Sequence, residues 1–233
     1  MRIIPHPSPN CGPRRGGARP DLVVLHYTAM HDTRAALARL SAPEHEVSAH
    51  YLICPRGRVF ALVDEELRAW HAGAGRWGGC DDVNSRSIGI ELANPGGTPF
   101  PAPQMRALEV LLADLMERRK IPPERVIGHS DMAPGRKIDP GPRFDWRRLA
   151  LQGLSVWPAS GEGAAAENSP DPAVFRAVLA RFGYDPDLSF GTLLAAFRLR
   201  FHPSGRGPLT AGEAAMAEEL AARWPVDRNR PGA

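Results

Sequence analysis

One segment in the middle of the chain combines residue types that could carry out chemistry. Residues 126–142 read VIGHSDMAPGRKIDPGP and place His129, Lys137 and Asp139 within eleven positions. The apolar run before His129 is typical of a short buried strand, and the proline and glycine residues after it indicate a loop that could bend Lys137 and Asp139 back towards it. Histidine and aspartate beside a lysine suggest metal ligands next to a fixed cation. A polar surface loop would have the same composition, so this segment alone leaves both interpretations open.

A second histidine, His26, ends another expected strand. It follows the continuous apolar run Leu22–Leu25, which is typical of a strand buried on both faces. Two histidines and one carboxylate leave a fourth coordination position for water, so His26, His129 and Asp139 predict a catalytic zinc site. Zinc lowers the pKa of bound water to about 7, which makes a nucleophile available at neutral pH. A non-haem iron site is the alternative. Its simplest sequence form is a tight HxD or HxE cluster, which these residues do not form, and metal analysis would decide between the two.

A carboxylate embedded in an apolar strand is the natural proton acceptor. Glu91 lies in the run Ser87–Leu92, and burying it unpaired would be costly, so we expect it to face a cleft. There it could take a proton from water and pass it to a leaving amine. Lys137 could direct its positive charge at the developing oxyanion. His50 and His71 also lie near expected strand ends, and spacing alone does not separate them from the other two histidines as ligands.

The elements that must position these residues are predicted by hydrophobic periodicity. Strand-like runs cover 22–25, 48–53, 58–63, 87–92 and 125–127, and helical patterns cover 33–40 and 103–120. Pro-Arg-Gly at 55–57 predicts a hairpin turn, residues 76–84 a loop, and residues 1–20 an irregular lead-in. Strands that alternate with helices argue for an α/β domain, residues 1–158, with a mixed central sheet flanked by helices.

The composition changes after Pro158. Residues 159–170 read ASGEGAAAENSP, which are small and polar and predict a linker. Residues 171–226 then carry three helical patterns and no strand pattern, which predicts a small three-helix C-terminal domain. It is too small to host the main chemistry, and we expect it to serve as a binding appendage.

Overall composition limits the class of protein. The 233 residues are 43% hydrophobic and 24% charged, with a net charge of +3, which is ordinary for a globular protein and gives little support to nucleic-acid binding. Three cysteines without CxxC spacing predict neither a disulfide framework nor a thiolate zinc cluster. No run is long enough to cross a membrane, and the N-terminus shows no signal peptide. We therefore expect a cytoplasmic monomer; a chain trimmed at its N-terminus would look the same and leaves a periplasmic or outer-membrane-associated protein as the alternative.

Four blocks of sequence carry a resemblance to a known family. They are VVLHYTA at 23–29, VSAHYLI at 47–53, RAWHAG at 68–73 with NSRSIGIEL at 84–92, and HSDMAPGRKIDPG at 129–141. In content and order they resemble the zinc-dependent N-acetylmuramoyl-L-alanine amidases that are related to bacteriophage lysozyme-like amidases and peptidoglycan-recognition proteins. The resemblance spans residues 1–158, and the C-terminal helices resemble, more loosely, a peptidoglycan-binding domain. It implies hydrolysis of the amide between N-acetylmuramic acid, or its anhydro form, and L-alanine of the stem peptide.

The resemblance also implies a role for each matching position. His26, His129 and Asp139 correspond to the ligands of one zinc ion, Glu91 to the catalytic acid/base, and Lys137 to the residue that stabilises the transition state. The matching positions expected to line or support the substrate groove are Tyr27, His50, His71 and Asn84. The expected partners are peptidoglycan or soluble anhydro-muropeptides, in recycling or in turnover of the wall. A non-catalytic peptidoglycan-recognition protein on the same fold is the alternative; such proteins typically lose a zinc ligand, whereas all three positions are filled here.

Overall fold

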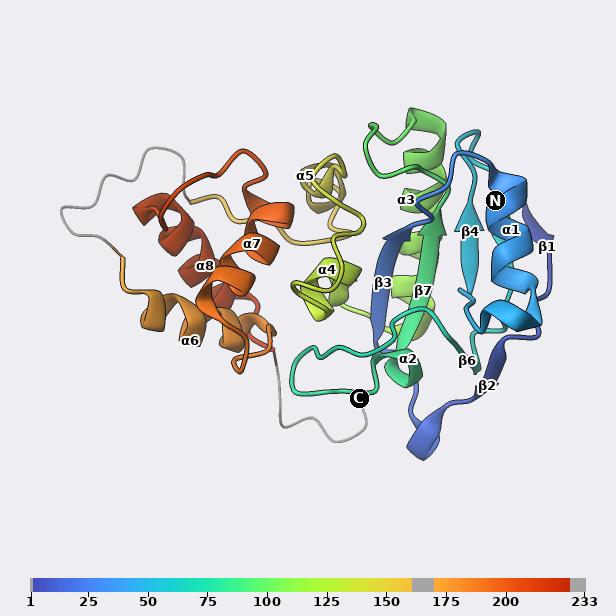
Figure 1. Cartoon of the computed structure of the whole chain (residues 1–233), viewed down its shortest axis with the longest axis horizontal. Helices are drawn as coiled ribbons and strands as arrows, with labels where there is room; N and C mark the ends of the chain where they lie inside the picture. Colours follow the sequence, from blue (N-terminus) through green and yellow to red (C-terminus); the bar gives the residue numbers. More distant parts are fainter. Residues whose placement is uncertain (1, 161–169, 227–233) are drawn as a thin grey trace.

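A computed structural model describes residues 2–160 and 170–226, and it shows a central sheet with helices on both faces (Figure 1). The main sheet has the order β1 (Ile3–Pro5), β5 (Val59–Ala61), β4 (Tyr51–Ile53), β7 (Ser87–Leu92), β3 (Leu22–Tyr27) and β8 (Val126–Gly128). A second, antiparallel pair joins β2 (Cys11–Pro13) to β6 (Leu67–Ala69). The α/β class with a mixed sheet flanked by helices is confirmed.

The helices of the described residues fall into three groups. Those of the N-terminal part are α1 (Thr33–Ser41), α2 (Val83–Arg86), α3 (Ala102–Arg119), α4 (His129–Met132) and α5 (Trp146–Ala150). The C-terminal helices are α6 (Pro172–Phe182), α7 (Phe190–Phe201) and α8 (Ala211–Arg223). Short 3-10 turns cover Arg15–Gly17, Pro43–His45 and Pro123–Arg125. None of the helices in these ranges is both long and apolar enough to span a membrane.

The directions of the strands bring the candidate residues to one edge of the sheet. β3 runs parallel to β7 and to β8, and β4 runs parallel to β7, while β5 is antiparallel to β4. The carboxyl ends of β3, β7 and β8 therefore meet at the same edge. In this register His26 pairs with Glu91, which places the two side chains next to each other on one face.

Alternation along the strands divides the core between the two faces of the sheet. Val23 and Leu25 point to the face covered by α3 and α5, together with Ile88 and Ile90 of β7. The opposite face is covered at one side by α1, which packs on β4 and β5, and at the other side by the C-terminal helices. By the same alternation, His26 and Glu91 point to this second face, which α1 covers at one side and the C-terminal helices at the other.

The C-terminal helices share a hydrophobic cluster with the sheet. Phe182, Phe197 and Phe201 belong to the same buried cluster as Val24 of β3 and Ile127 of β8. The three predicted helices are present at the expected places. The helices therefore bury one part of the second face of the sheet. The predicted linker, 159–170, lies for the most part outside the described residues.

Several local predictions are wrong in detail. Residues 1–20 are not wholly irregular, because β1 adds to the edge of the main sheet beside β5 and β2 pairs with β6. The strands predicted at 48–53 and 58–63 are each three residues long, and the loop predicted at 76–84 ends in the first turn of α2. His129 does not lead directly into a loop, because it is the first residue of α4. The side chain of Asp131 accepts the backbone N–H of Gly128, the residue before α4, at 2.7 Å.

Candidate active site and metal centre

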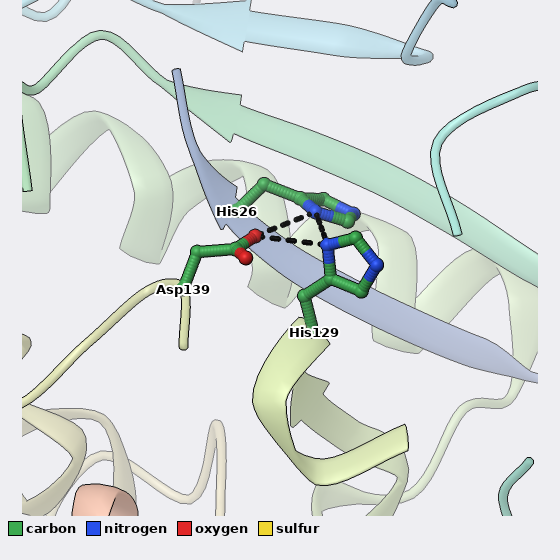
Figure 2. Close-up of side chains that lie close together, drawn as sticks. All are labelled: His26, His129 and Asp139. Carbon is green, nitrogen blue, oxygen red and sulfur yellow. Dashed lines mark hydrogen bonds and ion pairs between the residues drawn. The ribbon is translucent and has the colours of Figure 1, made fainter. Parts of the chain in front are cut away.

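Three side chains from separate elements converge on one point. His26 is the second-last residue of β3, His129 begins α4, and Asp139 lies on the loop that follows α4 (Figure 2). His26 Nδ1 lies 2.9 Å from His129 Nδ1, and Asp139 Oδ2 lies 3.0 Å from each of these nitrogens. All three residues are buried. The structure thus brings together the two histidines and the aspartate that the sequence singled out, in an arrangement that could hold a metal ion.

The protonation of these groups suits metal binding. His129 Nε2 lies 2.9 Å from the backbone carbonyl of Ala72, which can only accept, so Nε2 carries a proton and Nδ1 is the nitrogen that faces the centre. Burial, reinforced by the neighbouring His129, lowers the pKa of His26 to about 4. Burial alone would raise the pKa of Asp139, but its contacts with His129 and His26 outweigh this and hold the pKa below its usual value. Two imidazoles and one carboxylate are a donor set of catalytic zinc.

Glu91 stands beside this cluster with an unsatisfied carboxyl oxygen. Its Oε2 is buried and has no hydrogen-bond partner among the described residues. Burial, reinforced by the charge of Asp139 and opposed by Lys137, raises the pKa of Glu91 to about 8. A carboxyl group with a pKa near neutrality can both accept and donate a proton under physiological conditions. The expectation that Glu91 faces a cleft rather than the core agrees with its position.

A cavity of about 550 Å³ opens over the cluster. Its lining includes His26, His129, Asp139, Glu91, Lys137, Tyr27 and His71, with further residues from α1 and from the loop before β4. Lys137 is exposed at this cavity. The cavity therefore combines a candidate metal centre, a titratable carboxyl group and a cation.

The remaining predicted groove residues lie behind the cavity. His50 is fully buried: its Nδ1 accepts the backbone N–H of Gly89 at 2.9 Å, and its Nε2 lies 3.1 Å from the carbonyl of Leu67. Asn84 is also buried, and its Oδ1 accepts the backbone N–H of His71 at 3.0 Å and that of the next residue at 2.9 Å. Neither His50 nor Asn84 lines the cavity. Asn84 supports the segment that carries His71, which does line the cavity, and His50 links β7 to β6.

Arg136 is a residue at the site that sequence reasoning missed. Its Nη2 donates to the backbone carbonyl of Ala72 at 2.7 Å and also contacts the carbonyl of Ala74. Arg136 thereby ties the loop before α2 to the loop that carries Asp139, and it lines the cavity. The signal was present in the sequence as a second cation directly before Lys137, but only the fold shows that its partners are carbonyl groups some sixty positions away.

A buried ion pair connects α4 to the C-terminal helices. Asp131 Oδ2 accepts from Arg200 Nη1 at 2.7 Å, and Asp131 Oδ1 accepts from the Tyr184 hydroxyl at 2.6 Å. The side chains of Asp131 and Arg200 are 0% and 1% exposed. Because Asp131 also accepts the backbone N–H of Gly128, it braces the turn that presents His129. Arg200 and Tyr184 were not singled out by sequence, since nothing local marks their distant partner.

Comparison with known proteins agrees with this geometry. Residues 16–142 match the family described as N-acetylmuramoyl-L-alanine amidase. The N-acetylmuramoyl-L-alanine amidase AmiD of Escherichia coli is 38% identical over 234 residues, which cover 88% of this chain and 84% of AmiD. The 1,6-anhydro-N-acetylmuramyl-L-alanine amidase AmpD of Haemophilus influenzae is 44% identical over 103 residues, covering 44% of this chain and 56% of AmpD.

Solved structures extend the similarity over the C-terminal helices. The complex of Escherichia coli AmiD with anhydro-N-acetylmuramic acid-L-Ala-D-gamma-Glu-L-Lys superposes with a TM-score of 0.82 at 37% identity, covering 92% of this chain and 93% of that one. Pseudomonas aeruginosa AMPDH3 in complex with anhydromuramic pentapeptide gives a TM-score of 0.80 at 33% identity, covering 91% and 94%. The family match over more than half of the sequence and the similarity to AmiD along most of its length show that this chain belongs to the N-acetylmuramoyl-L-alanine amidase family.

Proposed function

We propose that this chain is a zinc-dependent N-acetylmuramoyl-L-alanine amidase. Its substrate would be the amide between N-acetylmuramic acid, or the anhydro form, and L-alanine of the stem peptide. The observation that carries the proposal is one cavity that holds the donor set of His26, His129 and Asp139 together with Glu91, whose pKa is raised to about 8. Membership of the amidase family supports the same reaction.

The ligand residues fit zinc better than the alternatives considered. Two imidazole nitrogens and one carboxylate oxygen leave an open coordination position, as hydrolytic zinc sites do. The lone pair of His129 Nδ1 faces the centre because its Nε2 proton is held by the carbonyl of Ala72. Zinc bound here would lower the pKa of water and polarise the scissile carbonyl. His26, His129 and Asp139 would hold one zinc ion per chain.

Glu91 and Lys137 would supply the remaining chemistry. Glu91 takes a proton from the attacking water as the oxygen bonds to the carbonyl carbon of the lactyl group. It then returns that proton to the nitrogen of L-alanine as the carbon–nitrogen bond breaks, so the products are a lactyl carboxylate and a free peptide amine. Lys137, exposed at the same cavity, places its ammonium group near the developing oxyanion.

The relatives support a choice of substrate. Solved structures of similar chains contain anhydromuramyl peptides, a tripeptide in AmiD and a pentapeptide in AMPDH3. A cavity of about 550 Å³ falls in the size range of sites for small ligands. We propose that soluble anhydro-muropeptides or peptidoglycan bind there, with Tyr27 and His71 in contact with the substrate as cavity-lining residues.

We also propose a division of the chain into a catalytic part, residues 1–158, and a helical part, residues 171–226. The hydrophobic cluster shared with β3 and β8 supports a structural role for the helical part, in addition to any contact with glycan. The ion pair between Arg200 and Asp131 supports the same role, because Asp131 braces the turn that presents His129.

The proposal is tested by measuring products and metal together. Wild type, Glu91→Ala and His129→Ala would be incubated with soluble anhydro-muropeptides and with intact sacculi, and released peptides analysed by mass spectrometry. Glu91→Ala should keep zinc and lose about 10²- to 10⁴-fold in turnover, because general acid–base catalysis is removed. His129→Ala should lose the metal. His45→Ala, at an exposed histidine on the turn Pro43–His45, is the matched control and should behave as wild type.

Two outcomes would contradict the proposal. Full activity of chelator-treated, metal-free protein would exclude the zinc mechanism. Binding of the wild type to sacculi, with no peptide released from sacculi or from soluble anhydro-muropeptides, would show a recognition protein rather than an amidase.

A further inference from the structure

We infer that His71 and Ser87 form a hydrogen-bond relay that sets the tautomer of the metal ligand His26. The inference rests on the proposed function, since it assigns positioning residues to the proposed zinc site. Two contacts define the relay: His26 Nε2 lies 3.0 Å from His71 Nδ1, and His71 Nε2 lies 3.1 Å from Ser87 Oγ. The relay ends at the backbone carbonyl of Val83, 2.6 Å from the same hydroxyl.

The direction of the relay follows from its last member. A carbonyl oxygen has no proton, so the single hydroxyl proton of Ser87 is donated to Val83, and the hydroxyl oxygen remains as an acceptor. His71 must then donate from Nε2, and its neutral ring presents a lone pair at Nδ1. That lone pair accepts the Nε2 proton of His26. The lone pair of His26 Nδ1 is thereby left facing His129 and Asp139, as metal coordination requires.

The two histidine ligands are thus fixed by different means. His129 is held directly by a backbone carbonyl, which cannot change its role. His26 instead depends on a second imidazole, that of His71, whose donor and acceptor nitrogens could exchange roles. If His71 carried its proton on Nδ1, His26 would have to present a lone pair at Nε2 and an N–H at Nδ1, and that N–H would point into the metal site. Ser87 is the group that prevents the reversal.

The surrounding structure accommodates the relay. Ser87 is fully buried and His26 is 2% exposed, so bulk water has little access to replace the hydroxyl. Asn84 Oδ1 accepts the backbone N–H groups of His71 and Ala72 and so holds the backbone at His71. Gly89 leaves room for the ring: a Cβ at this position would lie 2.4 to 2.7 Å from three ring atoms of His71. The absence of a side chain at Gly89 therefore serves the position of His71 over β7.

The experiment measures zinc affinity of the full chain by competition with a chromogenic chelator. Ser87→Ala removes the acceptor for His71 and should weaken zinc binding by about 10- to 100-fold, the usual effect of losing a partner of a metal ligand. The matched control is Ser85→Ala. Ser85 is equally buried in the preceding helix α2 and bonds Asp82 rather than the relay, so its zinc affinity should equal that of the wild type.

A conservative variant of the middle member separates the relay from simple packing. His71→Asn places an amide oxygen where the ring has Nδ1, and this oxygen accepts from His26 without help from Ser87. His71→Asn should therefore retain zinc affinity, whereas His71→Leu should lose it. In the His71→Asn background, adding Ser87→Ala should cause no further loss, which a double-mutant cycle measures.

The outcomes distinguish the relay from the proposed function. If His26→Ala binds zinc as the wild type does, the proposed zinc site is wrong. If His26→Ala loses zinc but Ser87→Ala binds it normally, the site stands and the relay is refuted. An equal loss from Ser87→Ala in the wild-type and His71→Asn backgrounds would also refute the relay, because the hydroxyl would then act by another route.

Discussion

Replacing Glu91 by glutamine should stabilise the metal-free protein while it abolishes turnover. Glu91 Oε2 is buried with no hydrogen-bond partner among the described residues, and burial raises the pKa of this carboxyl group to about 8. Glutamine has nearly the same shape and carries no charge at any pH. The substitution therefore removes the cost of ionising a buried group and keeps the packing around it.

The sign and size of the effect follow from the two pKa values. Between pH 4.5, the ordinary value for glutamate, and about pH 8, the native state holds a proton that the unfolded chain has released. The free energy of unfolding of the wild type therefore falls as pH rises through this window, by about 1.4 kcal/mol for each pH unit at most. Partial exposure at the cavity reduces the figure, and we expect Glu91→Gln to be more stable by about 2 to 3 kcal/mol at pH 7, and by nothing near pH 4.5.

Urea denaturation of chelator-treated protein at several pH values between 5 and 8 measures this difference. Contributions from His26, His129 and Asp139 are common to both proteins and cancel to first order. Glu117→Gln, at an exposed carboxylate on α3, is the control and should show no growing difference with pH. A difference between Glu91→Gln and wild type that stays constant across this range would refute the reasoning. Loss of turnover with zinc retained completes the expected result.

Two further predictions concern residues on either side of the metal site. Lys137→Met should lower kcat by about 10²- to 10³-fold with little change in KM, because the ammonium group acts on the transition state. Lys137→Arg should retain part of the rate that Lys137→Met loses. A change confined to KM would assign Lys137 to substrate binding instead. Arg200→Ala should lower the free energy of unfolding by about 3 to 5 kcal/mol, because it leaves the carboxylate of Asp131 buried without its cation. Adding Asp131→Asn to Arg200→Ala should recover part of that loss in urea denaturation, and a loss below 1 kcal/mol for the single variant would show that the pair is not essential.

The strands that carry the site were predictable because their residues are buried on both faces. β3 and β7 read as continuous apolar runs, and a charged or aromatic polar residue near the end of such a run, His26 or Glu91, stands out against it. The edge strand β1 was missed because it has no such run: two of its three residues are exposed, and only pairing with β5 defines it. β1 forms because its residues pair with residues more than fifty positions later in the chain, and a local sequence pattern does not reveal such pairing.

The sequence alone did not show which of His26, His50, His71 and His129 are the metal ligands. All four lie near strand ends and offer the same two nitrogens, so residue type and spacing do not rank them. In the structure the ranking comes from what each ring faces. His26 and His129 turn Nδ1 to each other and to Asp139. His50 instead uses its nitrogens on the backbone of Gly89 and Leu67, and His71 uses its nitrogens on His26 Nε2 and Ser87 Oγ.

The C-terminal helices show contacts with the sheet that composition does not indicate. A stretch of small and polar residues before α6 predicted a separate module. Yet the second face of the sheet presents Val24 and Ile127, and these would be exposed to water without Phe197 and its neighbours. A binding appendage needs no buried ion pair with the domain that it follows. Arg200 of α7, however, is buried between the C-terminal helices and α4, where it pairs with Asp131, the carboxylate that braces the turn before His129. Burial of that pair is costly unless both partners are always present, so the helices act as part of the scaffold of the site.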